Sequence, residues 1–207
     1  NKGEYLEKLK FPSKTSTFGP RIRSGDFGET LVADYLEYIE KYWIPRNRFE
    51  WRDTVDDPNK GTDVFGLRFK NDGSFHRDDV LIACEVKAKV SRNDNERLKI
   101  AVSHSAKDEY RLSLALNAAR QRFSKVGKNK EAEKIKRFQD KEDRPYKKEY
   151  GAAGIVTSNT IDDPELFNVD LTSHPDVNKL KLYIFHGTNL MTFVHQLYQK
   201  AIDEAGE

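Results

Sequence analysis

The sequence contains one cysteine, no long apolar run and little net charge, and each of these shortages excludes a class of protein. A single cysteine, Cys84, excludes an intramolecular disulfide and a multi-cysteine zinc site. The five histidines show no metal-ligand spacing, which argues against a histidine-based zinc centre. The longest apolar run, at residues 80–84, is far too short to cross a bilayer. We therefore expect a cytoplasmic protein without a membrane-spanning segment.

The composition is polar, but the chain is long enough to bury a substantial core. It has 207 residues, of which 37% are hydrophobic and 34% charged. An aromatic content of 11% argues against general disorder. We expect an N-terminal arm over residues 1–25 and a single domain over residues 26–207, with its core at about 26–157. The net charge of +2 is too small to require an anionic partner, so the placement of charges matters more than their sum.

The most informative stretch is the predicted strand at residues 81–90. Strand alternation places Glu85, Lys87 and Lys89 on one face. The residues of the opposite face are all apolar: Cys84, Val86, Ala88 and Val90. Burying a carboxylate and an ammonium beside a sheet is costly unless they pair, form hydrogen bonds or hold a metal ion. This Glu-x-Lys strand is therefore the first candidate for a functional site.

Hydrophobic spacing and turn signals place the remaining elements around this strand. A helix begins at Gly25, with Asp26 as its cap, and ends near Tyr42, ahead of Pro45. The other predictions are strands at 49–52, 62–69, 151–157 and 180–185, a hairpin turn at 71–73, a polar connection at 91–105, and helices at 106–123, 128–141 and 190–202. The buried candidates of helix 106–123 are Tyr110, Leu114, Ala118 and Phe123. The order α-β-β-β-α-α-β-β-α predicts an α/β fold with a mixed sheet flanked by helices.

Three acids and one lysine lie on three of these predicted elements. Glu29 lies on the first helix, Asp63 at the start of strand 62–69, and Glu85 with Lys87 on the third strand. Mg²⁺ takes oxygen ligands, usually one or two carboxylates with waters and a substrate phosphate. Asp63 and Glu85 are the predicted metal ligands, Glu29 is an accessory acid or a further ligand, and Lys87 directs the water or the phosphate. This set fits metal-assisted phosphodiester hydrolysis.

The segments Gly28-Glu29, Gly61-Thr62-Asp63 and Glu85-Val86-Lys87 resemble the motifs of the PD-(D/E)xK nuclease superfamily. The resemblance implies a restriction-endonuclease-like αβββαβ core with C-terminal additions, and a Mg²⁺-dependent endonuclease in which Mn²⁺ can substitute. Thr62 stands where the superfamily name has proline, a position that is commonly replaced. The longer segments around Gly28, Asp63 and Glu85 also resemble the HamA nuclease family of the Hachiman anti-phage system. That closer resemblance implies a helicase partner and a role in bacterial defence.

Each of these residues also has a plain structural interpretation. Asp63 can close a turn after Gly-Thr, and Glu29 can cap or salt-bridge its helix. Glu85 and Lys87 can form a cross-strand charge pattern on a half-solvated sheet. The order in which all four residues occur favours the metal site over these readings. His104, at the end of the polar connection, can approach the site, but a surface or cap role is the preferred interpretation.

A basic segment at residues 120–149 follows the third strand. It holds twelve lysines and arginines against six acids, so its charge of +6 exceeds that of the whole chain. Such a segment beside a phosphodiester site suits binding to a nucleic-acid backbone. The predicted nucleic-acid-binding residues are Lys89, Arg120, Arg122, Lys125 and Lys128. The alternative is a solvated helix with ion pairs such as Glu133 with Arg137.

The sequence thus predicts a metal-dependent nuclease that cleaves DNA in preference to RNA. A homodimer is compatible with cutting two strands, although no sequence feature locates an interface. One alternative is a catalytically inactive nuclease fold that binds nucleic acid or serves in assembly. A second alternative is a protein-interaction domain whose basic helix is only a solvated face. Cleavage assays with variants at Glu85 and Lys87 separate the three.

Overall fold

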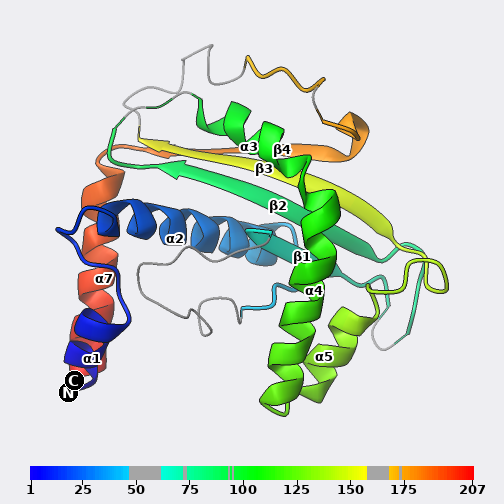
Figure 1. The fold of residues 1–207 in the computed structure, drawn as a ribbon, viewed down its shortest axis with the longest axis horizontal. Helices are drawn as coiled ribbons and strands as arrows, with labels where there is room; N and C mark the ends of the chain where they lie inside the picture. The colour runs from blue at the N-terminus through cyan, green and yellow to red at the C-terminus, as the bar shows by residue number, and fades with distance from the viewer. Residues whose placement is uncertain (47–61, 72–73, 93, 95, 158–167, 173) are drawn as a thin grey trace.

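The computed structural model describes residues 1–46, 62–71, 74–92, 94, 96–157, 168–172 and 174–207 (Figure 1). Over these residues the chain forms six α-helices and a four-stranded mixed sheet, which confirms the predicted α/β class. The predicted strand at 49–52 and most of the hairpin turn at 71–73 lie outside the described residues. No helix in the described ranges is long and apolar enough to cross a membrane.

The sheet has the strand order β1-β2-β3-β4. Its strands are β1 (Val64–Arg68), β2 (Val80–Lys89), β3 (Lys147–Thr157) and β4 (Leu180–Gly187). β1 runs antiparallel to β2, whereas β2, β3 and β4 are parallel to one another. β2 is therefore an inner strand with an antiparallel neighbour on one side and a parallel neighbour on the other.

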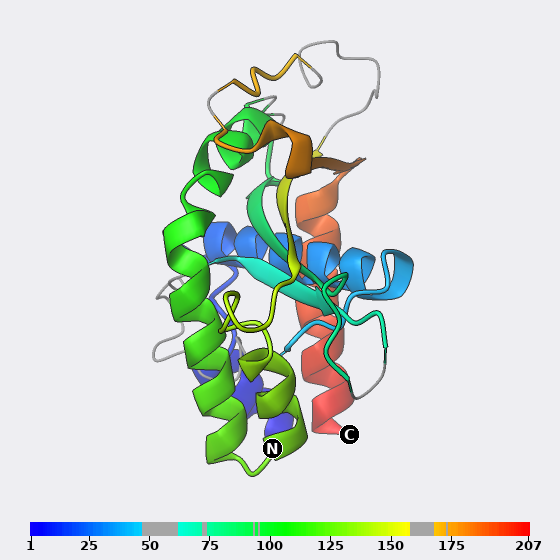
Figure 2. The ribbon, with the colours of Figure 1, turned by 90° about the vertical axis from the view of Figure 1, so that its right-hand side faces the viewer.

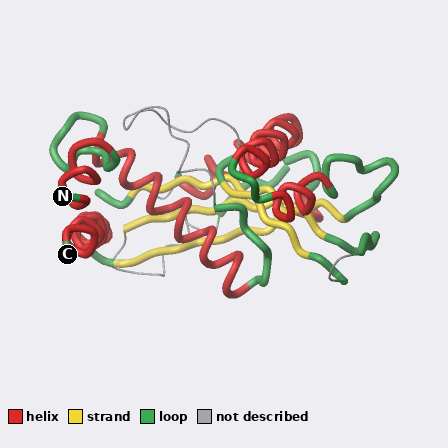
Figure 3. Tube along the Cα trace, turned by 90° about the horizontal axis from the view of Figure 1, so that it is seen from below, coloured by secondary structure: helices red, strands yellow, loops and turns green. Residues whose placement is uncertain are grey.

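Helices cover both faces of this sheet. The helices of the described chain are α1 (Lys2–Leu9), α2 (Gly19–Asp34), α3 (Arg97–Ser105), α4 (Asp108–Lys125), α5 (Asn129–Lys136) and α7 (Leu190–Gly206), and all but α1 pack against the sheet. α2 and α7 share one hydrophobic core with the sheet, and α3, α4 and α5 pack against the opposite face. Figure 2 shows the strands between α4 and α7, and Figure 3 shows α2 crossing the strands. α1 packs against α7, so the two termini lie side by side.

The alternation predicted for β2 is confirmed on its apolar face. Cys84, Val86 and Val90 belong to the core that α2 covers. A glycine at position 28 allows α2 to approach this face, because a Cβ there would lie 2.9 Å from the Cβ of Ala88. On the other face, Leu81 and Ala83 are buried under α4 and α5, and Glu85 follows them.

Several predicted boundaries in the first quarter of the chain are wrong. α2 begins at Gly19 rather than Gly25, with Pro20 in its first turn, where the fixed φ of proline suits a helix start. Asp26 therefore lies inside the helix and does not cap it; its Oδ2 accepts a hydrogen bond of 3.0 Å from Tyr198. The helix continues as a π-helical turn at Tyr35–Ile39. Residues expected in a loose arm instead form α1 and the first turns of α2.

The region between β2 and β3 also differs from the prediction. The polar connection at 91–105 contains α3, whose buried positions Leu98, Ala101 and Val102 follow helical spacing. In α4 the buried stripe runs through Leu112, Leu116, Ala119 and Phe123, whereas Leu114 is 71% exposed. The charged helix predicted at 128–141 is α5, which ends at Lys136.

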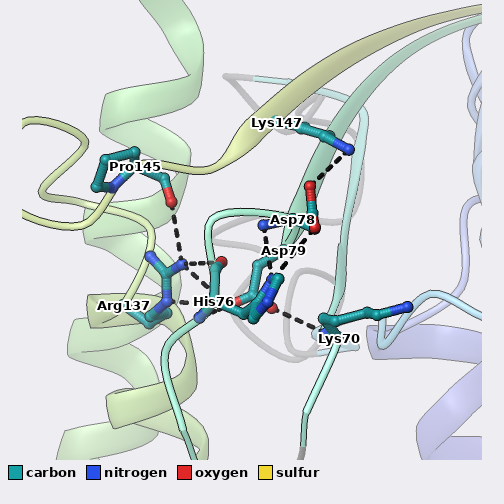
Figure 4. A network of polar contacts seen from close by, with 7 residues as sticks. All are labelled: Lys70, His76, Asp78, Asp79, Arg137, Pro145 and Lys147. Atoms are coloured by element: carbon teal, nitrogen blue, oxygen red, sulfur yellow. Dashed lines mark hydrogen bonds and ion pairs between the residues drawn. The ribbon is translucent and has the colours of Figure 1, made fainter.

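A buried ion pair joins the end of α5 to the beginning of β2 (Figure 4). Arg137 Nη2 lies 2.9 Å from Asp79 Oδ2, and both side chains are almost completely buried. The same guanidinium donates to the carbonyl oxygens of His76 and Arg144. Asp79 Oδ1 accepts a further hydrogen bond from the backbone of Lys70. Arg137 therefore pairs with Asp79 and not with Glu133, and it is not available to a nucleic acid.

Candidate functional site

Three of the residues that the sequence singled out meet where β1 begins beside β2. Val64 pairs with Cys84, which places Asp63, one residue earlier, beside Glu85. Asp63 Oδ2 accepts a hydrogen bond of 2.9 Å from the backbone N–H of Val86. This bond fixes the Asp63 carboxylate against β2, on the face that carries Glu85 and Lys87.

The Lys87 ammonium lies between the two carboxylates. Its Nζ donates to Glu85 Oε1 and lies 3.7 Å from Asp63 Oδ2. It also donates a hydrogen bond of 3.2 Å to the carbonyl oxygen of Val86. The lysine side chain is partly exposed, whereas only 2% of the Glu85 side chain is. The ammonium thus faces solvent on one side and buried carboxylate on the other.

The two oxygens of Glu85 have different surroundings. Oε1 contacts Lys87 and lies 3.4 Å from His104 Nδ1 on α3. Oε2 is buried and makes no hydrogen bond to any described residue, and Arg111 Nη1 on α4 lies 3.7 Å from it. Because a buried carboxylate oxygen normally has a hydrogen-bond partner, Oε2 is an acceptor whose bonding capacity is not met within the described chain.

His104 lies in the last turn of α3 and borders the site. Its side chain is 37% exposed, as a surface role requires, and its Nδ1 lies 3.4 Å from Glu85 Oε1, so it also approaches the site. Burial and the neighbouring Lys87 ammonium lower the pKa of His104 from its ordinary value, although the Glu85 carboxylate opposes them. A lowered pKa favours the neutral imidazole near neutral pH.

The donor set suits a hard divalent cation bound by two carboxylates. Asp63 and Glu85 offer oxygen atoms from neighbouring strands, which Mg²⁺ prefers to nitrogen or sulfur. The buried Glu85 Oε2 has no competing hydrogen bond within the described ranges. No three acidic, histidine or cysteine side chains gather around a metal position in the part of the chain that the structure describes. The remaining ligands would therefore be waters and substrate oxygens.

Glu29 approaches from a different direction. It lies on α2 next to Gly28, whose Cα faces Val86 and Ala88 on the apolar side of β2. One of its carboxylate oxygens is buried. It does not join Asp63 and Glu85 in a three-ligand group among the described residues. Its role as an accessory acid stays a prediction.

The predicted nucleic-acid-binding residues fall into two places. Lys89 lies on β2, two residues beyond Lys87 on the same face, next to the candidate site. The other four lie in the last turns of α4 and just after it: Arg120, Arg122, Lys125 and Lys128. The α4 members are about 14 to 21 Å along the helix from Arg111. Contact with a nucleic acid would therefore have to extend down α4, away from Glu85 (Figure 1).

Sequence reasoning did not single out Arg111. The residue lies in the first turns of α4, and the helix pattern alone does not show which side of that helix faces β2. The spacing from Arg111 to the buried Leu112 and Leu116 would have indicated a position at the border of the covered face. Only the packing of α4 against the sheet brings its guanidinium to Glu85.

The comparisons with known proteins give one result that covers nearly the whole chain. None of the curated proteins matches this sequence. A family model described as HamA matches residues 1–201, from α1 into α7. The matched segment includes the elements that carry Glu29, Asp63, Glu85 and Lys87, and it confirms the family resemblance seen in the sequence. The chain belongs to the HamA family, a component of Hachiman anti-phage defence.

Proposed function

We propose that this protein is a metal-dependent endonuclease that hydrolyses phosphodiester bonds of DNA during anti-phage defence. The observation that carries the proposal is the pair of carboxylates, Asp63 and Glu85, held side by side with Lys87 on one face of the sheet. A buried ion cluster of this kind adds little stability, because desolvation of the charges offsets much of their attraction, so a functional role is the better explanation for it. Membership of a defence family agrees with such an activity.

Each residue of the site would have a different role, which follows from its position. Asp63 and Glu85 hold Mg²⁺, or Mn²⁺ in its place, through carboxylate oxygens on neighbouring strands. The bound metal would polarise the phosphate and lower the pKa of a coordinated water. Lys87, at the solvent side of the pair, places a positive charge where negative charge develops on the phosphate. The hydrogen bond from Val86 keeps Asp63 in place throughout.

The wider surface supports contact with nucleic acid. Lys89 continues the cationic edge of β2, and the basic residues at the end of α4 can neutralise further backbone phosphates. We expect DNA to be preferred to RNA and binding to weaken as salt is raised. A helicase subunit is the proposed partner, and a homodimer is a further arrangement in which two strands can be cut.

Plasmid cleavage tests the catalytic assignment. Wild-type protein is incubated with supercoiled plasmid and Mg²⁺ or Mn²⁺, beside Asp63→Asn, Glu85→Ala and Lys87→Ala. Lys200→Ala removes an exposed lysine of α7, outside the basic segment at residues 120–149, and serves as the matched control. We expect the wild type and the control to nick or linearise the plasmid and the three site variants to lose cleavage. Equal cleavage by all five proteins would overturn the assignment.

The same assay separates the two alternatives. DNA binding without cleavage in either metal would favour an inactive nuclease fold that binds nucleic acid. Absence of DNA binding at low salt would favour a protein-interaction domain. Gel-shift measurements at low and high salt, run with the same five proteins, distinguish these outcomes.

A further inference from the structure

Arg111 and the buried carboxylate of Glu85 attract each other without forming a hydrogen bond. The guanidinium lies at 3.7 Å from Oε2, beyond hydrogen-bonding distance, and 38% of its side chain is exposed. Oε2 itself is buried and accepts no hydrogen bond within the described chain. The carboxylate and the guanidinium are thus near enough to attract each other, but no bidentate pair locks them together.

The charges of the site balance without a metal ion. Asp63 and Glu85 contribute two negative charges, and Lys87 and Arg111 contribute two positive charges within 4 Å of them. A divalent cation on the carboxylates would cancel the charge that attracts the two side chains. Arg111 is the easier of the two to release, because Lys87 also donates to a backbone carbonyl.

We infer that Arg111 is a counter-ion of Glu85 in the metal-free protein and moves to a substrate phosphate when a divalent cation binds. The inference rests on the proposed nuclease function and assigns a role to a residue outside the Asp63, Glu85 and Lys87 set. A guanidinium presents five N–H donors in a planar fork that matches phosphate oxygens. From the first turns of α4, Arg111 reaches the site from the helix that carries the other basic residues.

This exchange makes binding of metal and binding of DNA cooperative. Arg111 competes with the metal for Glu85 in the free protein, and it contacts phosphate only after the metal has replaced it. A coupling of this kind is reciprocal, and its usual size is about 5- to 150-fold in affinity. If Arg111 only held the Glu85 carboxylate in position, it would strengthen metal binding at Glu85. It would then contribute nothing of its own to DNA affinity.

The two roles predict opposite changes in metal affinity. Ca²⁺ binding is measured by calorimetry without DNA, and binding of a fluorescein-labelled DNA duplex is measured by anisotropy with EDTA or with Ca²⁺ at equal ionic strength. The proteins are wild type, Glu85→Gln, Arg111→Gln, Arg111→Lys and Lys200→Gln, the last of which removes an exposed charge from α7. Gel electrophoresis verifies that the duplex remains intact, and thermal melting verifies folding.

We expect Arg111→Gln to bind Ca²⁺ at least as tightly as wild type while its Ca²⁺-dependent gain in DNA affinity falls about tenfold, as the loss of a charged hydrogen bond implies. Arg111→Lys, which keeps the charge without the fork, should retain part of the gain and carries the test if Arg111→Gln does not fold. Lys200→Gln should match wild type.

Two results would overturn the inference, and they differ from failure of the nuclease proposal. Weaker Ca²⁺ binding by Arg111→Gln would make Arg111 a positioning residue for Glu85. If both Arg111 variants kept the full Ca²⁺-dependent increase in DNA affinity seen in the wild type, Arg111 would not contact phosphate. If wild type binds no divalent cation, or if Glu85→Gln binds it equally well, the nuclease proposal fails and this inference fails with it.

Discussion

Asp79 and Glu85 lie six residues apart on or beside β2, and both are buried, yet their surroundings differ. Asp79 is paired with Arg137, receives hydrogen bonds on both carboxylate oxygens, and its partner arginine is itself bound to backbone carbonyls (Figure 4). Glu85 has one oxygen paired with Lys87 and the other without a hydrogen bond in the described structure. The hydrogen-bonding capacity of Asp79 is thus met on both oxygens, whereas one oxygen of Glu85 has an unmet capacity to accept a bond.

The partners of the two acids differ in the same way. Arg137 is 8% exposed at its side chain and is enclosed by the chain around it. Lys87, His104 and Arg111, which surround Glu85, are all partly exposed. A saturated and enclosed ion pair fixes the position of α5 on the sheet, whereas a partly exposed and unsaturated one can exchange its partners. We therefore expect the Asp79 cluster to stabilise the fold and the Glu85 cluster to serve the proposed function.

Breaking the saturated cluster should have the largest effect. Arg137→Ala leaves the Asp79 carboxylate buried without its counter-ion and should lower the free energy of unfolding by about 3–5 kcal/mol. Lys136→Ala, one residue earlier and exposed, should change it by at most about 0.5 kcal/mol. Chemical denaturation of both variants measures the difference. A loss below about 1 kcal/mol for Arg137→Ala would place Asp79 and Glu85 in the same class.

A substitution of Glu85 should affect activity much more than it affects stability. Glu85→Gln keeps the volume of the side chain and removes a buried charge, so we expect the free energy of unfolding to change by at most about 1 kcal/mol. Metal affinity and plasmid cleavage should fall by more than about 100-fold, because the variant lacks one of the two proposed metal ligands. Denaturation and cleavage are measured on the same preparation. A variant that is strongly destabilised but fully active would reverse the comparison.

The basic end of α4 should contribute less than either acid. Lys125→Gln should weaken DNA binding uniformly across sequences and reduce the slope of log K against log salt by about 1. Arg137→Gln should leave this slope unchanged if the variant is folded, because the buried guanidinium reaches no phosphate. Gel shifts over a salt series provide the measurement. Equal slopes for wild type and Lys125→Gln would exclude this lysine from the interface.

The smallest effect concerns the histidine beside Glu85. Because the pKa of His104 is lowered, the unfolded chain takes up this proton first as the pH falls. The corresponding stability is present above about pH 6.5 and is lost below it. In His104→Gln the free energy of unfolding should therefore fall slightly less between pH 7.5 and pH 5 than in the wild type. The difference should be small because the ring is partly exposed to solvent. Denaturation at pH 5 to 7.5 compares the two proteins, and identical pH profiles would contradict the lowered pKa.

The sequence was sufficient where one strong periodicity determined the structure. The alternation along β2 predicted which residues face the core and which form the polar row, and the structure confirms it from Cys84 to Lys87. The proximity of Asp63 and Glu85 could be predicted because consecutive strands usually lie next to each other in a sheet, as β1 and β2 do. The buried strand at residues 151–157 was predictable because both of its faces are apolar.

The predictions that failed concern helices, and each failure has a physical cause. α3 was missed because two of its buried positions, Ala101 and Ser105, are too small to give a clear apolar stripe. In α4 the spacing of Leu114 with Ala118 fits a helix as well as that of Leu112 with Leu116, and only packing on β2 decides between them. The role of Arg111 depends on the same packing. A residue that reaches a site from across the fold leaves no local pattern in the sequence.

The most direct test of the account is the binding of Mn²⁺ to the purified chain, measured by calorimetry or electron paramagnetic resonance. The account predicts saturable binding by the wild type that Asp63→Asn and Glu85→Gln each abolish. Asp176→Asn, which removes a carboxylate paired with Lys179 on the surface, should bind Mn²⁺ as the wild type does. Equal Mn²⁺ binding by all four proteins would contradict the metal site at β2.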